Sequence, residues 1–124
     1  MRCEAKGMKH MARAMAATLD GLAACFRRET AFRQEVVCGV VNFAAAILLA
    51  GTLTETFVLV IVYMLLPLVE LLNSAIEEIV DMVSPQFNEC AKRAKDYASA
   101  ATFLAVIVVL GTWGCVLCRR FFAA

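Results

Sequence analysis

The sequence has one histidine, two prolines and six glycines in 124 residues, and none of its glycines belongs to a standard nucleotide-binding loop. The absence of a Walker A motif and of G-x-G-x-x-G excludes the common phosphate loops, so any nucleotide site is of a non-standard kind. Cys115 and Cys118 form a C-x-x-C pair, but no second pair and no second histidine accompany them. The ligand count is too low for zinc, and we interpret both cysteines as packing residues of a helix.

Charged residues are also scarce, at 19% against 62% hydrophobic residues, and the mean hydropathy is +0.76. This composition excludes an ordinary soluble domain and predicts a single membrane domain over residues 1–124. The formal net charge is only +1, and we expect no nucleic-acid partner. Charges interrupt the first 35 residues throughout, so we expect no secretory signal peptide and a cytoplasmic N-terminus.

Apolar runs predict an all-α membrane protein in which three helices cross the bilayer, over residues 31–50, 55–82 and 85–118. Within the third helix, residues 98–118 supply the uncharged span. An amphipathic helix over residues 6–30 precedes them, with methionines and leucines on one stripe and cations on the other side. This helix suits the membrane surface; the alternative is a helix that packs on the rest of the protein.

Local signals set the expected helix boundaries. Thr52 and Glu55 have the spacing of a capping box, which predicts the start of the second span after a tight turn. Pro67 is expected to kink that span, because it removes one backbone donor. Ser84 and Pro85 predict the N-cap and the first residue of the third helix.

Lysine and arginine are unevenly distributed between the two ends of the predicted spans. Seven of the twelve precede the first long apolar run, none lies between the first two spans, three lie between the second and third, and two follow the third. The positive-inside rule places the N-terminus and the second loop in the cytoplasm and the C-terminus on the opposite side.

One polar face of the second predicted span carries the expected chemistry. Positions three and four apart share one side of a helix, which brings together Glu70, Asn73, Ser74, Glu77 and Asp81. A charge inside a span costs about 2.5–3.5 kcal/mol, so it needs a partner or a function. Glu29 and the cations around Lys95 are expected at the same membrane boundary. Carboxylates beside cations suit Mg²⁺ and a polyphosphate, whereas the alternative is a structural hydrogen-bond network between helices.

These residues resemble the small prokaryotic diacylglycerol kinases, integral membrane enzymes that phosphorylate a lipid alcohol with MgATP. The matching stretches are Glu29 with residues 31–35, the E-x-x-N-S-A-I-E run within residues 69–81, and A-K-D at residues 94–96 followed by Ser99. The similarity covers about residues 21–113. It implies a homotrimeric bundle in the bacterial inner membrane, with active sites shared between subunits, the N-terminus cytoplasmic and the C-terminus periplasmic.

The resemblance also implies roles for individual residues. Glu70 is expected to be the general base, with Asn73 and Lys95 as further catalytic residues, and Glu29 and Glu77 are expected to bind Mg²⁺. The expected nucleotide-binding residues are Glu29, Glu77, Lys95, Asp96, Gln86, Asn88 and His10. The expected lipid-substrate residues are Ala31, Phe32, Arg33, Gln34, Glu35, Glu70, Ser99 and Trp113. The chain departs from the family at His10, where an arginine is common, and at Pro67, in a stretch usually free of proline.

These roles predict ATP-dependent phosphorylation of diacylglycerol to phosphatidic acid at the cytoplasmic membrane interface, by direct in-line transfer with Mg²⁺. A polyprenol kinase acting on undecaprenol is the alternative within the family, and Ser74 favours the diacylglycerol branch. A different class stays open, a non-enzymatic three-span subunit whose carboxylates form an ion or proton pathway. We expect depth to set the role of each carboxylate, with Glu70 facing the lipid and Asp81 forming the solvated end of the helix.

Overall fold

A computed structural model describes the backbone of residues 2–123 and the side chains of residues 6–123. Within this part of the chain there are five helices and no strand: α1 (Arg2–Arg28), α2 (Thr30–Leu49), α3 (Leu53–Tyr63), α4 (Leu65–Val83) and α5 (Glu89–Phe122). Three segments are long and apolar enough to cross a membrane, Thr30–Leu49, Leu53–Val83 and Glu89–Phe122. The predicted all-α architecture with three spans is confirmed.

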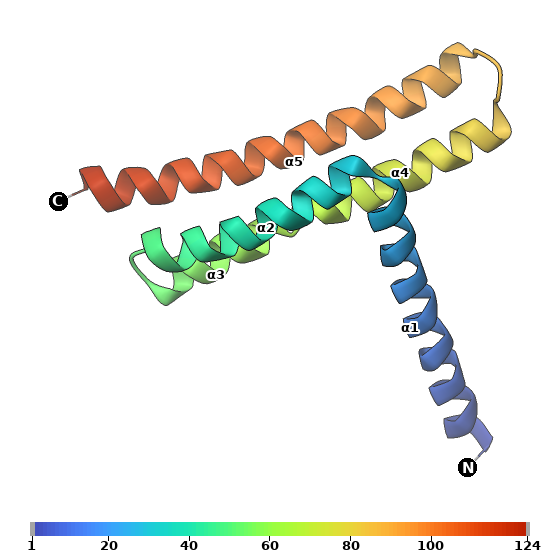
Figure 1. Ribbon diagram of the computed structural model, residues 1–124, viewed down its shortest axis with the longest axis horizontal. Helices are drawn as coiled ribbons and strands as arrows, with labels where there is room; N and C mark the ends of the chain where they lie inside the picture. The colour runs from blue at the N-terminus through green and yellow to red at the C-terminus, as the bar shows by residue number, and fades with distance from the viewer. Residues whose placement is uncertain (1, 124) are drawn as a thin grey trace.

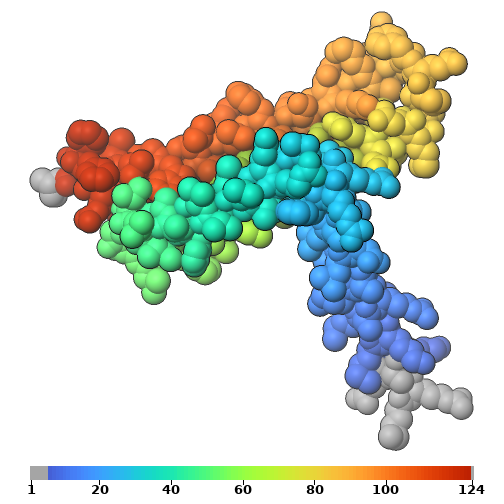
Figure 2. Space-filling view, in the orientation of Figure 1, coloured from blue at the N-terminus to red at the C-terminus, as the bar shows by residue number. Residues whose placement is uncertain are grey.

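The helices form a long bundle with one projecting arm. α2, the consecutive pair α3 and α4, and α5 run side by side, and α1 leaves them at a steep angle (Figure 1). The α2–α3 turn and the C-terminus share one end of the bundle, and the α4–α5 loop lies at the other. In Figure 2, α1 stands apart from the bundle, and its residues 6–20 are all exposed. An amphipathic helix that crosses the direction of the spans supports the expected position on the membrane surface.

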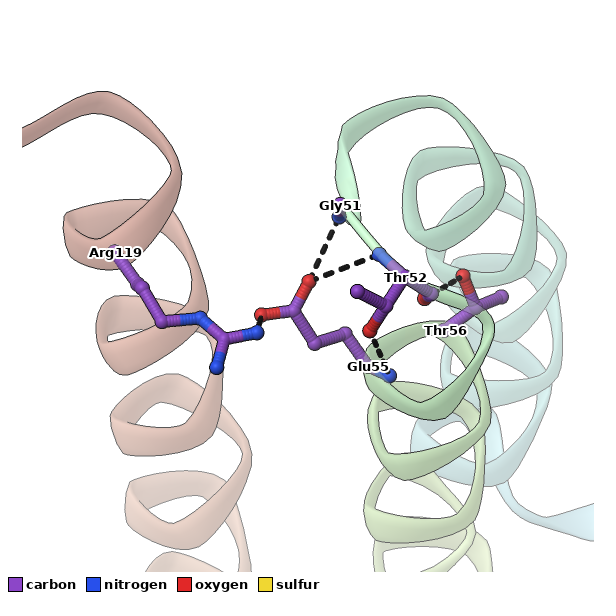
Figure 3. A network of polar contacts seen from close by, with 5 residues as sticks. All are labelled: Gly51, Thr52, Glu55, Thr56 and Arg119. Carbon is purple, nitrogen blue, oxygen red and sulfur yellow. Dashed lines mark hydrogen bonds and ion pairs between the residues drawn. The ribbon is translucent and has the colours of Figure 1, made fainter. Parts of the chain in front are cut away.

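The turn between α2 and α3 is closed by the predicted capping box (Figure 3). Thr52 Oγ1 accepts a hydrogen bond from the Glu55 N–H at 3.2 Å, and the Glu55 carboxylate accepts from the N–H groups of Thr52 at 3.1 Å and Gly51 at 2.7 Å. Arg119 of α5 forms an ion pair with the same carboxylate, whose side chain is only 13% exposed. This contact, which the sequence did not predict, ties the end of α5 to the α2–α3 turn.

Pro67 interrupts the second span, as expected. α3 ends at Tyr63 and α4 begins at Leu65, so the break falls on Met64, close to one turn before the proline. Pro67 has no N–H to donate to the carbonyl of Tyr63, four residues earlier. The Met64 N–H bonds to the Ile61 carbonyl at 3.1 Å, three residues before it, which makes a tighter turn than an α-helix.

The third long helix begins later than predicted. The expected start at Pro85 is wrong, because Ser84 is the C-cap of α4 and the chain stays irregular up to Asn88. The Asn88 side-chain oxygen accepts from the N–H groups of the second and third residues of α5, at 2.8 and 3.3 Å. α5 then continues to Phe122, beyond the predicted end at residue 118. Two capping residues four positions apart are available here, and the asparagine forms the cap.

A buried amide links three helices inside the bundle. Asn42 of α2 is 8% exposed, and its Oδ1 accepts a hydrogen bond from Trp113 Nε1 of α5 at 2.8 Å. Its Nδ2 donates to the carbonyl of Leu59 in α3 at 3.5 Å. The Trp113 ring packs against both apolar clusters of the bundle, Tyr63, Leu66, Ala105 and Val109 on one side and Ala46, Leu59 and Val116 on the other. The single polar group of Trp113 is thus satisfied within the core.

We expect Asn42→Leu to lower the free energy of unfolding by about 1 kcal/mol, because the Trp113 N–H then loses its acceptor inside the membrane. A double-mutant cycle with Trp113→Phe measures the interaction itself, using reversible unfolding in mixed detergent micelles. If the two single effects add with no coupling energy, the amide does not stabilise the bundle through this hydrogen bond.

Candidate active site

Polar side chains converge where α1 joins the bundle, and most of them come from α4. Glu70 is 5% exposed and makes no hydrogen bond to any other residue that the structure describes. Asn73, one turn further along, donates from Nδ2 to Glu77 Oε1 at 3.3 Å, while its own Oδ1 is buried without a partner among the described residues. α4 therefore presents the predicted polar face, with its carboxylates at increasing distance from the membrane interior.

An acidic pocket of about 440 Å³ opens beside this face. Its walls come from α4 and from the α1–α2 corner, and they are formed by Glu29, Ser74, Glu77, Glu78, Asp81 and Met82. Glu29 is the N-cap of α2, but its side chain forms no capping hydrogen bond, so the carboxylate is available to a ligand. The structure thus brings the two predicted metal ligands, Glu29 and Glu77, to one pocket.

The donor set of this pocket fits a magnesium ion that keeps part of its own coordination shell. Among the described residues, no group of three or more His, Cys, Asp and Glu side chains is arranged to hold a metal by itself. Magnesium in nucleotide sites is usually held by one or two carboxylates, with water and phosphate oxygens completing the octahedron. Two carboxylates, Glu29 at the α1–α2 corner and Glu77 on α4, are compatible with that arrangement.

A second polar pocket of about 440 Å³ lies between the end of α4 and the start of α5. Four predicted nucleotide-binding residues line it together, Gln86, Asn88, Lys95 and Asp96. Lys95 Nζ donates to Asp81 Oδ1 at 2.5 Å, and Asp81 lines both this pocket and the acidic one. Asp81 is exposed, as expected for the solvated end of the helix, and it also pairs with Lys95 in the wall of the second pocket.

An apolar cavity of about 660 Å³ lies on the membrane side of the polar face. Residues of α1, α2, α3 and α4 line it, including Leu22, Phe32, Gly39, Tyr63, Pro67 and Leu68. Glu35 is its one carboxylate, and Glu35 Oε2 is buried without a partner among the described residues. The Tyr63 hydroxyl donates to the Glu35 carbonyl at 2.6 Å and so fixes the backbone beside that carboxyl group.

The last turns of α1 contact α4 through two side-chain pairs. Arg28 Nη1 donates to Glu78 Oε1 at 2.8 Å, with both side chains well exposed. Cys25 is buried, and its Sγ lies 3.9 Å from Ser74 Oγ. Burial raises the pKa of the Cys25 thiol, so the sulfur stays protonated and can donate to the serine. No spacing rule connects residues this far apart in the sequence, and sequence reasoning missed both pairs.

Three predicted site residues, His10, Trp113 and Arg33, do not line the pockets described above. His10 is exposed on the free part of α1, 19 residues before Glu29 and so roughly 28 Å away along the helix. Trp113 is partly buried against the apolar clusters of the bundle, 14 residues or about 21 Å along α5 from Ser99. Arg33 turns back to the end of α1, where its guanidinium binds backbone carbonyls.

Comparison with known proteins identifies the family of this chain. The family model described as prokaryotic diacylglycerol kinase matches residues 16–117. The diacylglycerol kinase of Pseudomonas aeruginosa is 43% identical over 111 residues, which cover 90% of each chain. That of Escherichia coli K12 is 38% identical over 111 residues, again 90% of each chain, and that of Haemophilus influenzae is 34% identical over 90% of this chain and 94% of its own. This chain therefore belongs to the prokaryotic diacylglycerol kinase family.

Proposed function

We propose that this protein uses ATP to phosphorylate diacylglycerol, forming phosphatidic acid at the membrane boundary where α4 contacts both α1 and α5. Family membership supports the reaction, and one observation supports the site. Along α4, the buried Glu70 lies between Pro67 and Leu68, which line the apolar cavity, and Ser74 and Glu77, which line the acidic pocket. A carboxylate in that position can meet a lipid hydroxyl from one side and a phosphate from the other.

The reaction needs positioning and charge stabilisation more than covalent help from the protein. Glu70 takes the proton of the lipid hydroxyl, whose oxygen forms a bond to the γ-phosphorus while the bond from that phosphorus to the ADP oxygen breaks. Asn73 holds Glu77 in place through their hydrogen bond. Lys95 offsets negative charge that develops on the phosphate oxygens. Glu29 and Glu77 would hold Mg²⁺, and the bound ion would neutralise charge on the nucleotide phosphates.

The nucleotide would lie in the polar pocket at the α4–α5 loop. Gln86, Asn88, Lys95 and Asp96 line that pocket, which supports their assignment to ATP. His10 can join them only if α1 of another copy reaches across, because α1 of the same chain projects away from the loop (Figure 1). A homotrimer with sites shared between subunits would provide that copy. It would also cover part of the apolar surface that the spans expose.

On the membrane side, one acyl chain would enter the apolar cavity while the glycerol hydroxyl meets Glu70. Phe32 and Glu35 line the cavity, and the unpartnered Glu35 oxygen is suited to accept a hydrogen bond from the glycerol region. Ala31, Gln34 and Ser99 are exposed near the same boundary and are proposed to flank the lipid. The protein would lie in the bacterial inner membrane with a cytoplasmic N-terminus and a periplasmic C-terminus.

Filling the cavity should therefore select against long acyl chains. We expect Val36→Trp to raise the apparent KM for a long-chain diacylglycerol, because excluding two or three methylenes costs about 2 kcal/mol, or roughly 30-fold. A short-chain diacylglycerol should be affected much less. The matched control is Val37→Trp, one position along α2, whose side chain is exposed and does not line the cavity. Equal effects on both chain lengths would exclude the cavity as the acyl site.

Purified protein in phospholipid vesicles, supplied with labelled ATP and Mg²⁺, tests the proposed reaction. With diacylglycerol as acceptor, labelled phosphatidic acid should accumulate. If undecaprenol is phosphorylated and diacylglycerol is not, the protein is a polyprenol kinase. A protein that labels neither lipid yet dissipates an ion or proton gradient would be a pathway-forming subunit, and the kinase proposal would be wrong.

A further inference from the structure

The corner between α1 and α2 is made by one residue. α1 ends at Arg28, α2 begins at Thr30, and Glu29 between them is extended, with φ −98° and ψ 115°. The chain changes direction sharply at this point (Figure 1). The Glu29 N–H still bonds to the Cys25 carbonyl at 2.8 Å, but the following carbonyls of the last turn have lost their helical partners.

Arg33, in the first turn of α2, satisfies those carbonyls. Its Nη1 donates to the carbonyls of Phe26 at 3.1 Å and Arg27 at 2.9 Å, and its Nη2 donates to Thr30 Oγ1 at 3.0 Å. A cation at the C-terminal end of a helix is also favoured by the helix dipole. One planar guanidinium with several N–H groups can make all three bonds at once, which the single ammonium group of lysine does poorly.

The other side-chain hydrogen bonds between α1 and the bundle are weaker. The ion pair between Arg28 and Glu78 has side chains 70% and 63% exposed, and such surface pairs contribute little. The contact between Cys25 and Ser74 has a sulfur donor at 3.9 Å. Arg33 therefore makes more hydrogen bonds at the corner than any other described side chain, and the corner carries Glu29 at the rim of the acidic pocket.

We infer that Arg33 is a positioning residue for the metal site, which holds Glu29 opposite Glu77, and that it does not contact the lipid. This inference rests on the proposed function. Without the guanidinium, the corner gains freedom, Glu29 departs from the pocket, and a higher Mg²⁺ concentration is needed for activity. Loss of Arg33 removes no lipid contact, because Arg33 does not line the apolar cavity.

The test compares Arg33→Gln, Arg33→Lys and a matched control, Arg27→Gln, in the full-length protein reconstituted in phosphatidylcholine vesicles. Arg27 lies at the same corner and loses the same charge, but its side chain makes no hydrogen bond to the described residues. At saturating ATP, we expect Arg33→Gln to raise the half-maximal Mg²⁺ concentration about tenfold and Arg33→Lys to raise it less. The apparent KM for diacylglycerol should stay within twofold, and Arg27→Gln should match the wild type.

A raised lipid KM with an unchanged Mg²⁺ requirement would overturn the inference and assign Arg33 to the lipid. An equal rise of the half-maximal Mg²⁺ concentration in Arg27→Gln would also overturn the inference, because the loss of one positive charge would then explain the effect. Amide hydrogen exchange of the segment around Glu29 needs no activity and keeps the inference testable in a poorly active variant. Exchange should be faster in Arg33→Gln than in Arg27→Gln. If the wild type forms no phosphatidic acid, the proposed function fails, while the exchange result still decides whether Arg33 holds the corner.

Discussion

Glu70→Gln should lower kcat for phosphatidic acid formation by on the order of 10³-fold, within the range usual for loss of a general base. Glutamine keeps the size and shape of the side chain but cannot accept the hydroxyl proton. Glu70 makes no hydrogen bond to other described residues, so the change removes none. ATP binding and assembly should therefore stay close to those of the wild type. Steady-state turnover in vesicles, together with ATP binding measured separately, checks this expectation.

Glu55→Gln is the matched control for this experiment. Glu55 is also a partly buried glutamate of the second span, but it lies at the opposite end, in the capping box with Arg119 (Figure 3). The same chemical change there should weaken the α2–α3 turn and leave kcat near the wild-type value. Turnover at the wild-type rate in Glu70→Gln would exclude Glu70 as the base.

Glu77→Gln should raise the Mg²⁺ concentration required for half-maximal activity by roughly 10- to 100-fold, because one of the two carboxylates proposed to hold the ion is lost. Glu77 Oε1 also accepts the Asn73 hydrogen bond, which a glutamine oxygen can still accept. The effect is thus expected on the metal rather than on local structure. Mg²⁺ titrations at saturating ATP and lipid measure it, and Glu29→Gln should behave in the same way.

Asp20→Asn serves as the control, since Asp20 is exposed on α1 and does not line the acidic pocket. It removes the same charge and should leave the Mg²⁺ requirement unchanged. The half-maximal Mg²⁺ concentration should also rise more in Glu77→Gln than in Arg33→Gln. Glu77→Gln removes a proposed ligand, whereas Arg33→Gln only makes the position of Glu29 less fixed. A normal Mg²⁺ requirement in both Glu77→Gln and Glu29→Gln would place the metal elsewhere.

Much of the fold could be predicted because its signals are local. The apolar runs identify three spans, and the break at Met64 follows from the proline three residues later. The capping box at Thr52 and Glu55 needs only residues within one turn. The start of α5 was mispredicted because local signals do not decide it. Ser84 and Asn88 are both good local caps, and their surroundings decide between them.

For the candidate site, helical spacing alone predicted which residues of α4 share a face. The pairing of Asp81 with Lys95 could have been suspected, because antiparallel helices joined by a short loop bring their ends together. Neither helical spacing nor loop length indicates the role of Arg33. Its charge and position suggest a lipid contact as readily as a helix cap, and only the direction in which α1 leaves the bundle places the carbonyls within its reach.

The sequence by itself determined that this protein is helical, crosses the membrane three times and carries a gradient of carboxylates along its second span, because each property depends on composition and helical spacing. The tertiary structure decided which residues from different helices meet. It brought Glu29 and Glu77 to one pocket, paired Trp113 with Asn42 inside the bundle, and paired Arg119 with Glu55 at the α2–α3 turn. These contacts depend on how the helices pack, and residues far apart in a chain carry no local signal of the distance that packing will leave between them.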